Sequence, residues 1–348
     1  PVSFLRKPFV VMGTNTTAVA IVGAGGIGCA LGYALLRGGV DVIFVETNRE
    51  KREWGVRNGV AVDQLPPQPA VFVSFDDWTP SADDLILLCT KCYDNHVVLQ
   101  RVPESAPIIP VQNGFDTQLA DRVDVEGIAS FVTECVPGRT QTRITRPGDL
   151  HIGFQTHLEG RALSPRMERL IGALEHYGSF EVRRVPEVLP FKNTKLMYNA
   201  AISPIAAVAG LDNGQLLTIP AARKLFFGLL HENYKILKAS GAHLEKIGPF
   251  RPDTVNCFLR LPLVARILAI PFSRTLHGTY CSMAGDLPNG PTELDNYNGY
   301  LLELAGDRRS PLNREVYRLV RRVEEDRSEP GLDWLGALLA STQIGRAA

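Results

Sequence analysis

The fold is decided by AVAIVGAGGIGCALGYALLR, residues 18–37. An apolar run leads into Gly23-Ala24-Gly25-Gly26-Ile27-Gly28, and a run with helical spacing follows. In a G-x-G-x-x-G turn between a strand and a helix, the first glycine makes the tight turn, the second lets the backbone approach a pyrophosphate, and the third lets the helix pack closely. The free N–H groups at the helix start attract phosphates. We therefore predict that residues 23–28 bind a dinucleotide; the alternative is a tight turn without a ligand.

The same stretch could be mistaken for a membrane helix, because residues 18–36 carry no charge. Five glycines interrupt the stretch, so we interpret it as a buried strand, a turn and a helix, and predict no membrane anchor. Near the N-terminus, Arg6 and Lys7 accompany an apolar run that is too short for a signal peptide. Met12 is a candidate natural start, and we expect residues 1–16 to be a flexible extension.

An acidic residue stands where such turns place the ribose contact. Glu46 ends the second apolar run and lies 23 residues after Gly23, so its carboxylate is positioned to bind the ribose hydroxyls. A carboxylate there favours NAD and repels the additional phosphate of NADP. Arg49, Lys51 and Arg52 follow closely and are an opposing signal, because they would either contact a 2′-phosphate or form a solvated helix face.

The rest of the chain divides into two halves of different character. The first half alternates short apolar runs with helical patterns, which is typical of a parallel sheet with crossover helices. Expected strands are residues 18–22, 41–45, 70–75, 84–90, 107–113, 127–132, 145–154 and 179–185, with a helix at 164–177. From Glu187 the patterns are helical, with the clearest helices at 195–211, 221–241, 292–306 and 311–326. We predict an α/β dinucleotide-binding domain over 1–185 and an all-α domain over 186–348.

Composition excludes several classes of protein. The 348 residues include 37 basic and 37 acidic side chains, so the chain lacks the basic excess typical of nucleic-acid or acidic-membrane binding. Six cysteines in a chain of this length do not form a disulfide framework, and we expect a reducing, cytoplasmic location. Cys89 and Cys92 form an isolated C-x-x-C in an apolar run, and the seven histidines lack metal-binding spacing. No metal is predicted.

Two blocks in the second half carry a family resemblance. They are PFKNTKLMYNAAISPIAAVAGLDNGQL (190–216) and CSMAGDLPNGPTELDNYNGYLL (281–302). Together with the glycine-rich turn, they resemble the ketopantoate reductase (2-dehydropantoate 2-reductase) family over about residues 17–325. The resemblance implies a Rossmann-like domain followed by a helical domain like that of 6-phosphogluconate dehydrogenase. It implies reduction of a small branched 2-keto acid with NAD(P)H, usually NADPH, in pantothenate biosynthesis, and by analogy a homodimer.

The residues of the first block support that chemistry independently. Lys195, Asn199 and Ser203 are spaced by four, so they share one face of a mostly apolar helix. Burial of Lys195 would lower its pKa towards neutrality and suit it to donate a proton to a keto oxygen. The resemblance implies this role for Lys195; the alternative is a snorkelling lysine at a helix end.

Further site residues are implied by the resemblance. Glu293 would lie beside Lys195 and hold the reacting hydroxyl, although a first-turn carboxylate also stabilises a helix dipole. Ser282 would bind the substrate carboxylate, and Asn213 would contact the substrate, although Asn-Gly is also a turn signal. Lys91 and Asn113 follow strands of the first half, where they would contact both cofactor and substrate.

The chain also departs from the family pattern. Ser203 precedes Pro204 where the family has asparagine, Glu46-Thr47 replaces a frequent arginine, and the Ser282–Glu293 stretch is one residue short. Residues 244–276 form an expanded segment. Two other functions therefore stay open: an NAD-dependent D-2-hydroxyacid dehydrogenase of the same architecture, and a non-catalytic NAD(P)-binding sensor.

Overall fold

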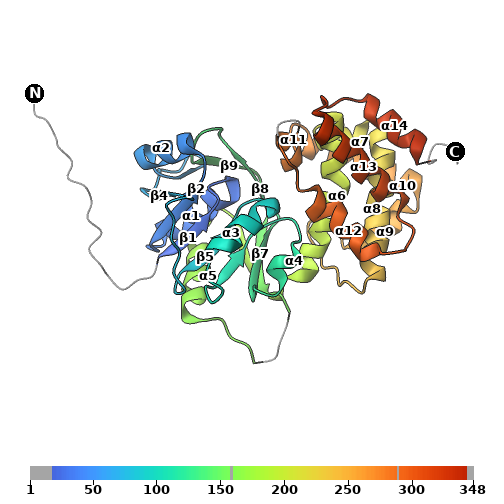
Figure 1. Ribbon diagram of the computed structural model, residues 1–348. Coiled ribbons are helices and arrows are strands. Elements are labelled where there is room, and N and C mark those ends of the chain that lie inside the picture. Colours follow the sequence, from blue (N-terminus) through green and yellow to red (C-terminus); the bar gives the residue numbers. More distant parts are fainter. Residues whose placement is uncertain (1–17, 157–159, 288–289, 343–348) are drawn as a thin grey trace, which may run out of the picture.

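The computed structural model describes residues 18–156, 160–287 and 290–342. An α/β part is followed along the chain by a helical part, and the two lie side by side (Figure 1). The fold class predicted from the sequence is confirmed. The expectation for residues 1–16 falls outside the described residues.

A five-stranded parallel sheet forms the centre of the α/β part. Its strands are β1 (Val19–Val22), β2 (Val42–Glu46), β4 (Val71–Ser74), β5 (Leu85–Leu88) and β6 (Ile108–Pro110), in the spatial order β4-β2-β1-β5-β6. Val22 lies in register with Val45 of β2 and Leu88 of β5, so three strands end at one level. Strand order reverses between β1 and β5, and ligands of open α/β sheets bind at this switch point.

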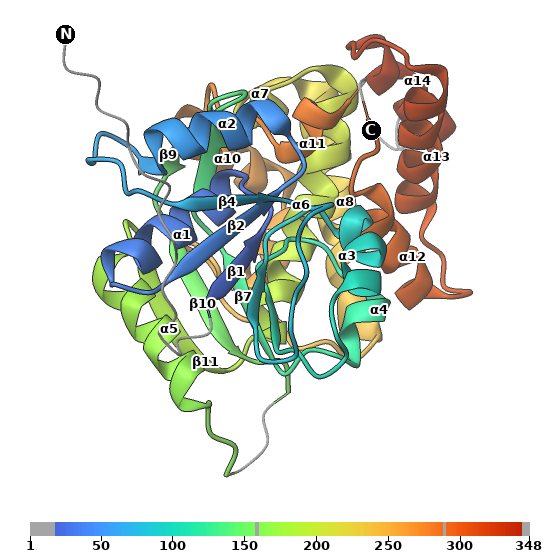
Figure 2. The ribbon, with the colours of Figure 1, turned by 60° about the vertical axis from the view of Figure 1, so that its left-hand side comes forward.

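Helices cover both faces of this sheet, which explains its uninterrupted apolar strands. Figure 2 shows α1 (Gly26–Arg37) and α5 (Pro165–Tyr177) on one side, and α3 (Asn95–Arg101) and α4 (Thr117–Ala120) on the other. α2 (Arg49–Asn58) packs beside β4, and a short 3-10 turn, η1 (Cys92–Asp94), precedes α3. A separate apolar core lies on each face. The stretch from 18 to 36 is therefore a buried strand, turn and helix, as predicted.

Two small sheets correct the sequence-based strand boundaries. The expected strands 127–132 and 145–154 are each split between two sheets. In one sheet β10 (Asp149–Phe154) lies between β7 (Val125–Ala129) and β11 (Glu181–Glu187). In the other, β9 (Gln141–Arg146) lies between β8 (Val132–Cys135) and β3 (Ala61–Val62). The two segments come close together where each passes from one sheet to the other. A Cβ on Gly148 would lie 2.6 Å from the Phe131 nitrogen, so this close approach requires glycine.

The helical part is built around two long central helices, α6 (Leu189–Ala209) and α8 (Pro220–Ala239). The other elements are α7 (Gln215–Thr218), α9 (Pro252–Leu259), α10 (Pro262–Leu276), α11 (Ser282–Asp286), η2 (Asp295–Gly299), α12 (Tyr300–Ala305), α13 (Pro311–Asp326) and α14 (Asp333–Ser341). The helix expected at 292–306 instead begins with the π-helical turn η2. Within the described ranges, no strand follows Glu187 and no helix is both long and apolar enough to cross a membrane.

Buried amides join the central helices. The Asn313 side chain donates to Glu232 (2.9 Å) and to Asn233 (2.8 Å) of α8, and accepts from Asn298 of η2 (2.9 Å). Asn298 also donates to the Ala200 carbonyl of α6 (2.9 Å). All three asparagines are fully buried. The network therefore fixes η2 against α6, and with it the segment that precedes η2.

Replacing Asn313 by alanine should lower the free energy of unfolding by about 1–3 kcal/mol, because it leaves buried polar partners unsatisfied. Denaturant titration followed by circular dichroism would measure the change. An exposed asparagine on α2, Asn58, offers a control: Asn58→Ala should cost less than about 0.5 kcal/mol. Equal effects of the two substitutions would contradict a structural role for the network.

Candidate active site

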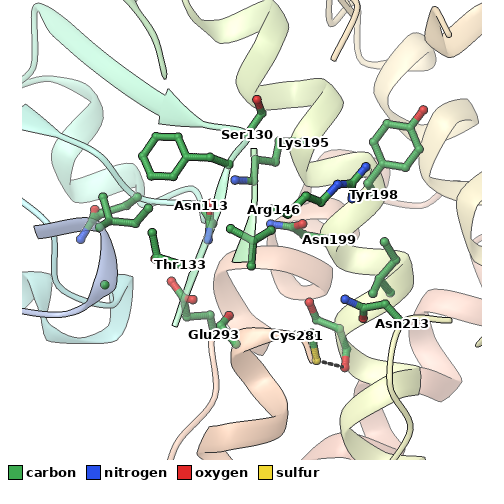
Figure 3. Close-up of a pocket in the computed structure, with 18 of the residues that line it drawn as sticks. Asn113, Ser130, Thr133, Arg146, Lys195, Tyr198, Asn199, Asn213, Cys281 and Glu293 are labelled. Atoms are coloured by element: carbon green, nitrogen blue, oxygen red, sulfur yellow. Dashed lines mark hydrogen bonds between the residues drawn. The ribbon is translucent and has the colours of Figure 1, made fainter. Parts of the chain in front are cut away.

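A cleft of about 1540 Å³ opens at the carboxyl ends of the central strands and continues into the helical part. Both parts of the chain line it, and Figure 3 shows their side chains pointing into the same space. Its volume exceeds the roughly 300–1000 Å³ of a pocket for one drug-sized ligand. The cleft is therefore large enough for a dinucleotide and a second molecule.

The glycine turn has the geometry of a dinucleotide cradle. Gly23 has φ +97°, and a Cβ there would lie 2.9 Å from the Thr90 nitrogen. A Cβ on Gly28 would lie 2.0 Å from the Gly23 oxygen, whereas one on Gly25 would meet nothing within 4 Å. The first and third glycines thus permit the tight turn and the helix packing, and the second faces open space. The residues present fit a bound pyrophosphate.

Gly26 is not one of the three glycines of the motif, but it must be glycine because of the neighbouring strand β8. A Cβ at this position would lie 2.3 Å from the Thr133 hydroxyl oxygen of β8. Thr133 lines the cleft beside Gly25, Gly26 and Ile27. The small β3-β9-β8 sheet therefore closes one side of the cradle.

Glu46 is already bound to the turn. Its carboxylate accepts hydrogen bonds from the Ala24 amide (3.0 Å) and the Asn48 amide (2.9 Å), and it lines the cleft. Ala24 and Gly28 do not line the cleft; they act through the backbone and through packing. Glu46 thus holds the turn in shape while it faces the ligand space.

The three basic residues after Glu46 differ in orientation. Arg49 pairs with Glu53 (2.7 Å), and Arg52 donates to the carbonyl oxygens of Glu46 (2.8 Å) and Thr47 (2.7 Å). Lys51 instead lines the cleft and donates to the Ala24 oxygen (3.1 Å), with its ammonium 3.9 Å from Glu46. Of the three, Lys51 is the one beside the ligand space.

Lys195 is partly buried at the joint between the two parts. Its ammonium, on α6, donates to the Ala129 carbonyl at the end of β7. Burial lowers the pKa of Lys195 from 10.5 to about 8; the Glu293 carboxylate opposes this shift, and Arg146 adds to it. Asn199 and Ser203 line the cleft on the same face of α6. The expected polar stripe is present, and the pKa of its lysine is lowered to about 8.

A cluster of charges crosses between the two parts beside Lys195. Lys91, after β5, lies 2.9 Å from Asp286 and 3.5 Å from Glu293. Burial alone would lower the pKa of Lys91, but the two carboxylates outweigh it and raise that pKa. At a pH at which Lys195 loses its proton, Lys91 therefore remains protonated.

Glu293 is held by three groups. Its side chain is buried, and it accepts hydrogen bonds from the Cys92 amide (3.3 Å) and the Tyr297 hydroxyl (3.0 Å). Tyr297 in turn hydrogen-bonds with Ser282, and burial raises its pKa well above the ordinary value. Glu293 forms an ion pair with Lys91 and not with Lys195, although its charge acts on Lys195.

The remaining predicted polar residues line the same cleft. Asn113 faces it from the end of β6, and Asn213 from the turn before α7. Asn213 donates to the Thr279 hydroxyl (3.3 Å), while its buried Oδ1 has no hydrogen-bond partner among the described residues. The Ser203 carbonyl accepts from the Cys281 thiol (3.6 Å). The Asn213 oxygen is thus an acceptor available to a ligand donor.

Sequence reasoning missed two charged residues of the site. Asp286 pairs with Lys91, and Arg146 lines the cleft close to Lys195 (Figure 3). The signal for Arg146 was its place before Pro147-Gly148, where a strand ends. Of the C-x-x-C pair, Cys92 is buried, whereas Cys89 is partly buried and lines the cleft. Burial raises the pKa of the Cys89 thiol to about 12.

Two family models match the chain. The N-terminal ketopantoate reductase PanE/ApbA model covers residues 19–157, and the PanE/ApbA C-terminal model covers residues 188–324. The chain belongs to the ketopantoate reductase family. It is an oxidoreductase of the ketopantoate reductase type.

Individual members of the ketopantoate reductase family are distant from the chain. The 2-dehydropantoate 2-reductase of Halobacterium salinarum is 24% identical over 322 residues, covering 88% of this chain and 99% of the relative. The structure of a PanE/ApbA family ketopantoate reductase from Ralstonia eutropha superposes with a TM-score of 0.69 at 21% identity, covering 90% of this chain and 100% of that one.

A second solved structure has the same fold. The ternary structure of D-mandelate dehydrogenase with NADH and anilino(oxo)acetate gives a TM-score of 0.71 at 18% identity, over 89% of this chain and 99% of that one. At 18% identity this similarity establishes the fold and nothing about the reaction.

Proposed function

We propose that the protein reduces the 2-keto group of a 2-keto acid to a hydroxyl group with a reduced nicotinamide cofactor. The observation that carries the proposal is the partly buried ammonium of Lys195, with a pKa of about 8, in the same cleft as the glycine turn. A general acid is most effective when its pKa lies near the working pH.

The reaction needs one hydride and one proton. A reduced nicotinamide dinucleotide, with its pyrophosphate held by the glycine turn, would supply the hydride for C2. The keto oxygen becomes a hydroxyl by accepting a proton from the Lys195 ammonium, which is left as a neutral amine. In the proposal Glu293 keeps Lys195 partly protonated through its charge and holds the reacting hydroxyl, while Lys91 neutralises Glu293 and Asp286 and contacts both ligands.

The substrate would be held by polar groups around Lys195. Its carboxylate would bind Ser282 and the guanidinium of Arg146, a planar group suited to carboxylates. Asn113, Asn199 and Asn213 would orient the keto group, and Ser203 completes this wall. The free Oδ1 of Asn213 supports this assignment, because a buried acceptor without a donor is costly.

For the cofactor we propose NAD. The Glu46 carboxylate faces the place of the ribose and would repel a 2′-phosphate. Lys51 is the single opposing signal among the three basic residues, and it is engaged with Ala24 and Glu46. An NAD-dependent D-2-hydroxyacid dehydrogenase is the second candidate function, and Glu46 and Ser203 favour it. A non-catalytic NAD(P)-binding sensor is disfavoured, because it would not need the proton donor Lys195.

Domain limits, assembly and location remain part of the proposal. We place the cofactor domain at 1–185 and the catalytic domain at 186–348, since β11 ends at Glu187 and α6 begins at Leu189. All six cysteines are free thiols, which supports a reducing, cytoplasmic location. Exposed apolar side chains on α10, including Leu263 and Ile267, are a surface that a second copy would cover in a homodimer.

Substituting Lys195 by alanine should lower kcat at least about a hundredfold, because it removes the proton donor. Affinity for NADH, measured by fluorescence titration, should be nearly unchanged. The control is Lys235→Ala, which removes an exposed lysine of α8 and should leave kcat intact. Turnover of Lys195→Ala at the wild-type rate would rule out the assignment.

The pH profile offers a separate test. Reduction requires protonated Lys195, so kcat/KM should be level below pH 8 and fall above the pKa of about 8. Glu293 raises that pKa and Arg146 lowers it, so Glu293→Gln should move the falling limb to lower pH and Arg146→Gln to higher pH. If kcat/KM fell only near the ordinary lysine pKa, or if neither variant moved the pH at which it falls, Lys195 could not be the proton donor.

Cofactor choice can be tested at Glu46. The wild type should prefer NADH, and Glu46→Gln should lower the ratio of kcat/KM for NADH to that for NADPH at least about tenfold, because the repulsive charge is lost. Arg49→Gln is the control, since Arg49 pairs with Glu53. A wild-type preference for NADPH would overturn the proposed cofactor.

A further inference from the structure

The cleft has an apolar half that the proposed chemistry does not use. Beyond Lys195 it continues between α7, α8, the segment 247–250, α9 and α10. Among the described residues, those of these elements that line the cleft carry no charge. We call this half the apolar chamber; its walls include Phe226, Leu230, Phe250, Phe258, Leu268 and Phe272.

The apolar chamber opens directly beside the reactive amine. Lys195, Asn199 and Ser203 form one stripe of α6, and the neighbouring stripe is formed by Tyr198 and Ile202. Both stripes line the cleft. A molecule whose keto group reaches Lys195 therefore has its next carbons at the entrance of the chamber.

The chamber walls are held in place. α9 is tied to α8 by the Tyr234 hydroxyl, which donates to Asp253 (2.6 Å), and by a hydrogen bond between His231 and Asn256 (2.7 Å). The ring centroids of Phe250 and Phe258 lie 5.5 Å apart in an edge-to-face arrangement. Phe250 meets Phe272 of α10 in the same way, at 6.1 Å. These contacts preform an aromatic wall.

A compact, hydroxylated keto acid such as ketopantoate matches the chamber poorly. Its alcohol group would enter a region without charged partners, and its few carbons would leave most of the aromatic wall exposed to water. An aromatic or long branched substituent would instead bury its area there, and aromatic rings gain further from edge-to-face contacts. The expanded segment 244–276 contributes α9 and α10, which build this wall.

We propose that the substrate is a 2-keto acid with a bulky apolar substituent at C2, best an aromatic one, and that the apolar chamber binds this substituent. The inference rests on the proposed function and specifies its substrate class. Its reaction is R–CO–COO⁻ + NAD(P)H + H⁺ giving R–CHOH–COO⁻ + NAD(P)⁺, with R in the chamber. The polar groups around Lys195 hold the other end of the molecule.

The test compares kcat/KM for phenylglyoxylate, 4-methyl-2-oxopentanoate and ketopantoate, each with NADH and NADPH. The first two should exceed ketopantoate by at least about tenfold, the gain expected from burying a large apolar group. Equal or better rates with ketopantoate would overturn the inference and leave the proposed function intact.

Chamber variants localise the effect. Ala269 lines the chamber and is 5% exposed, so Ala269→Phe should lower kcat/KM for phenylglyoxylate at least tenfold and leave ketopantoate nearly unchanged. The control is Lys235→Phe, which adds the same ring at an exposed position of α8 outside the cleft and should change neither. Phe258→Ala removes part of the wall without adding bulk and should also reduce the aromatic preference. Loss with both substrates in both chamber variants would contradict the inference.

Failure of the proposed function would give a different experimental result from failure of the chamber assignment. No oxidation of reduced cofactor with any 2-keto acid would refute the reductase. Calorimetric titration of phenylglyoxylate would then still test the chamber: binding that Ala269→Phe abolishes supports it, and absence of binding to the wild type overturns it.

Discussion

The partial burial of one ammonium group between the two parts of the chain is the constraint on which the rest of the site depends. Lys195 belongs to the helical part, but its hydrogen-bond acceptor is the Ala129 carbonyl of the α/β part. Burial favours the neutral amine, and the nearby Glu293 carboxylate favours the ammonium. The pKa of about 8 is the balance of these effects, so it exists only while the two parts remain docked.

The docking surface is built to keep that balance. The ring of Phe115 stacks on Tyr300, with centroids 4.5 Å apart, and the Phe115 carbonyl accepts from the Asn296 side chain (2.9 Å). A Cβ on Gly114 would lie 2.6 Å from the Asn296 Cβ, so only glycine allows this approach. The glycine of the Asn113-Gly114 pair therefore serves domain contact, and not merely a turn.

Local pattern predicted what depends on local physics. The strand, glycine turn and helix of residues 18–37, and the spacing of Lys195, Asn199 and Ser203, follow from backbone geometry and periodicity, and the structure contains both. The division of 127–132 between two sheets was not predictable, because Ser130 and Phe131 continue an apolar run whose partners lie elsewhere in the chain. The π-helical turn η2 was not predictable either, because its Asn298 bonds to the Ala200 carbonyl of α6 and to the Asn313 side chain of α13.

The candidate site shows the same division between local and long-range information. Residues such as Glu293 and Ser282 entered through motif resemblance, whereas the Lys91–Asp286 pair joins positions that are 195 residues apart and needed the fold. The expanded segment 244–276 was visible in the sequence, but the apolar chamber was not, because the side chains that line it depend on how α9 and α10 pack. In our proposal, substrate class is therefore set by tertiary packing around a reaction centre that the motifs predict.

The most direct measurement of the central claim is the pKa of Lys195 itself, followed by NMR of ¹³C-lysine-labelled enzyme, with the resonance assigned by its absence in Lys195→Met. The account predicts titration near pH 8, well below the ordinary lysine value. Titration near 10.5 would contradict it.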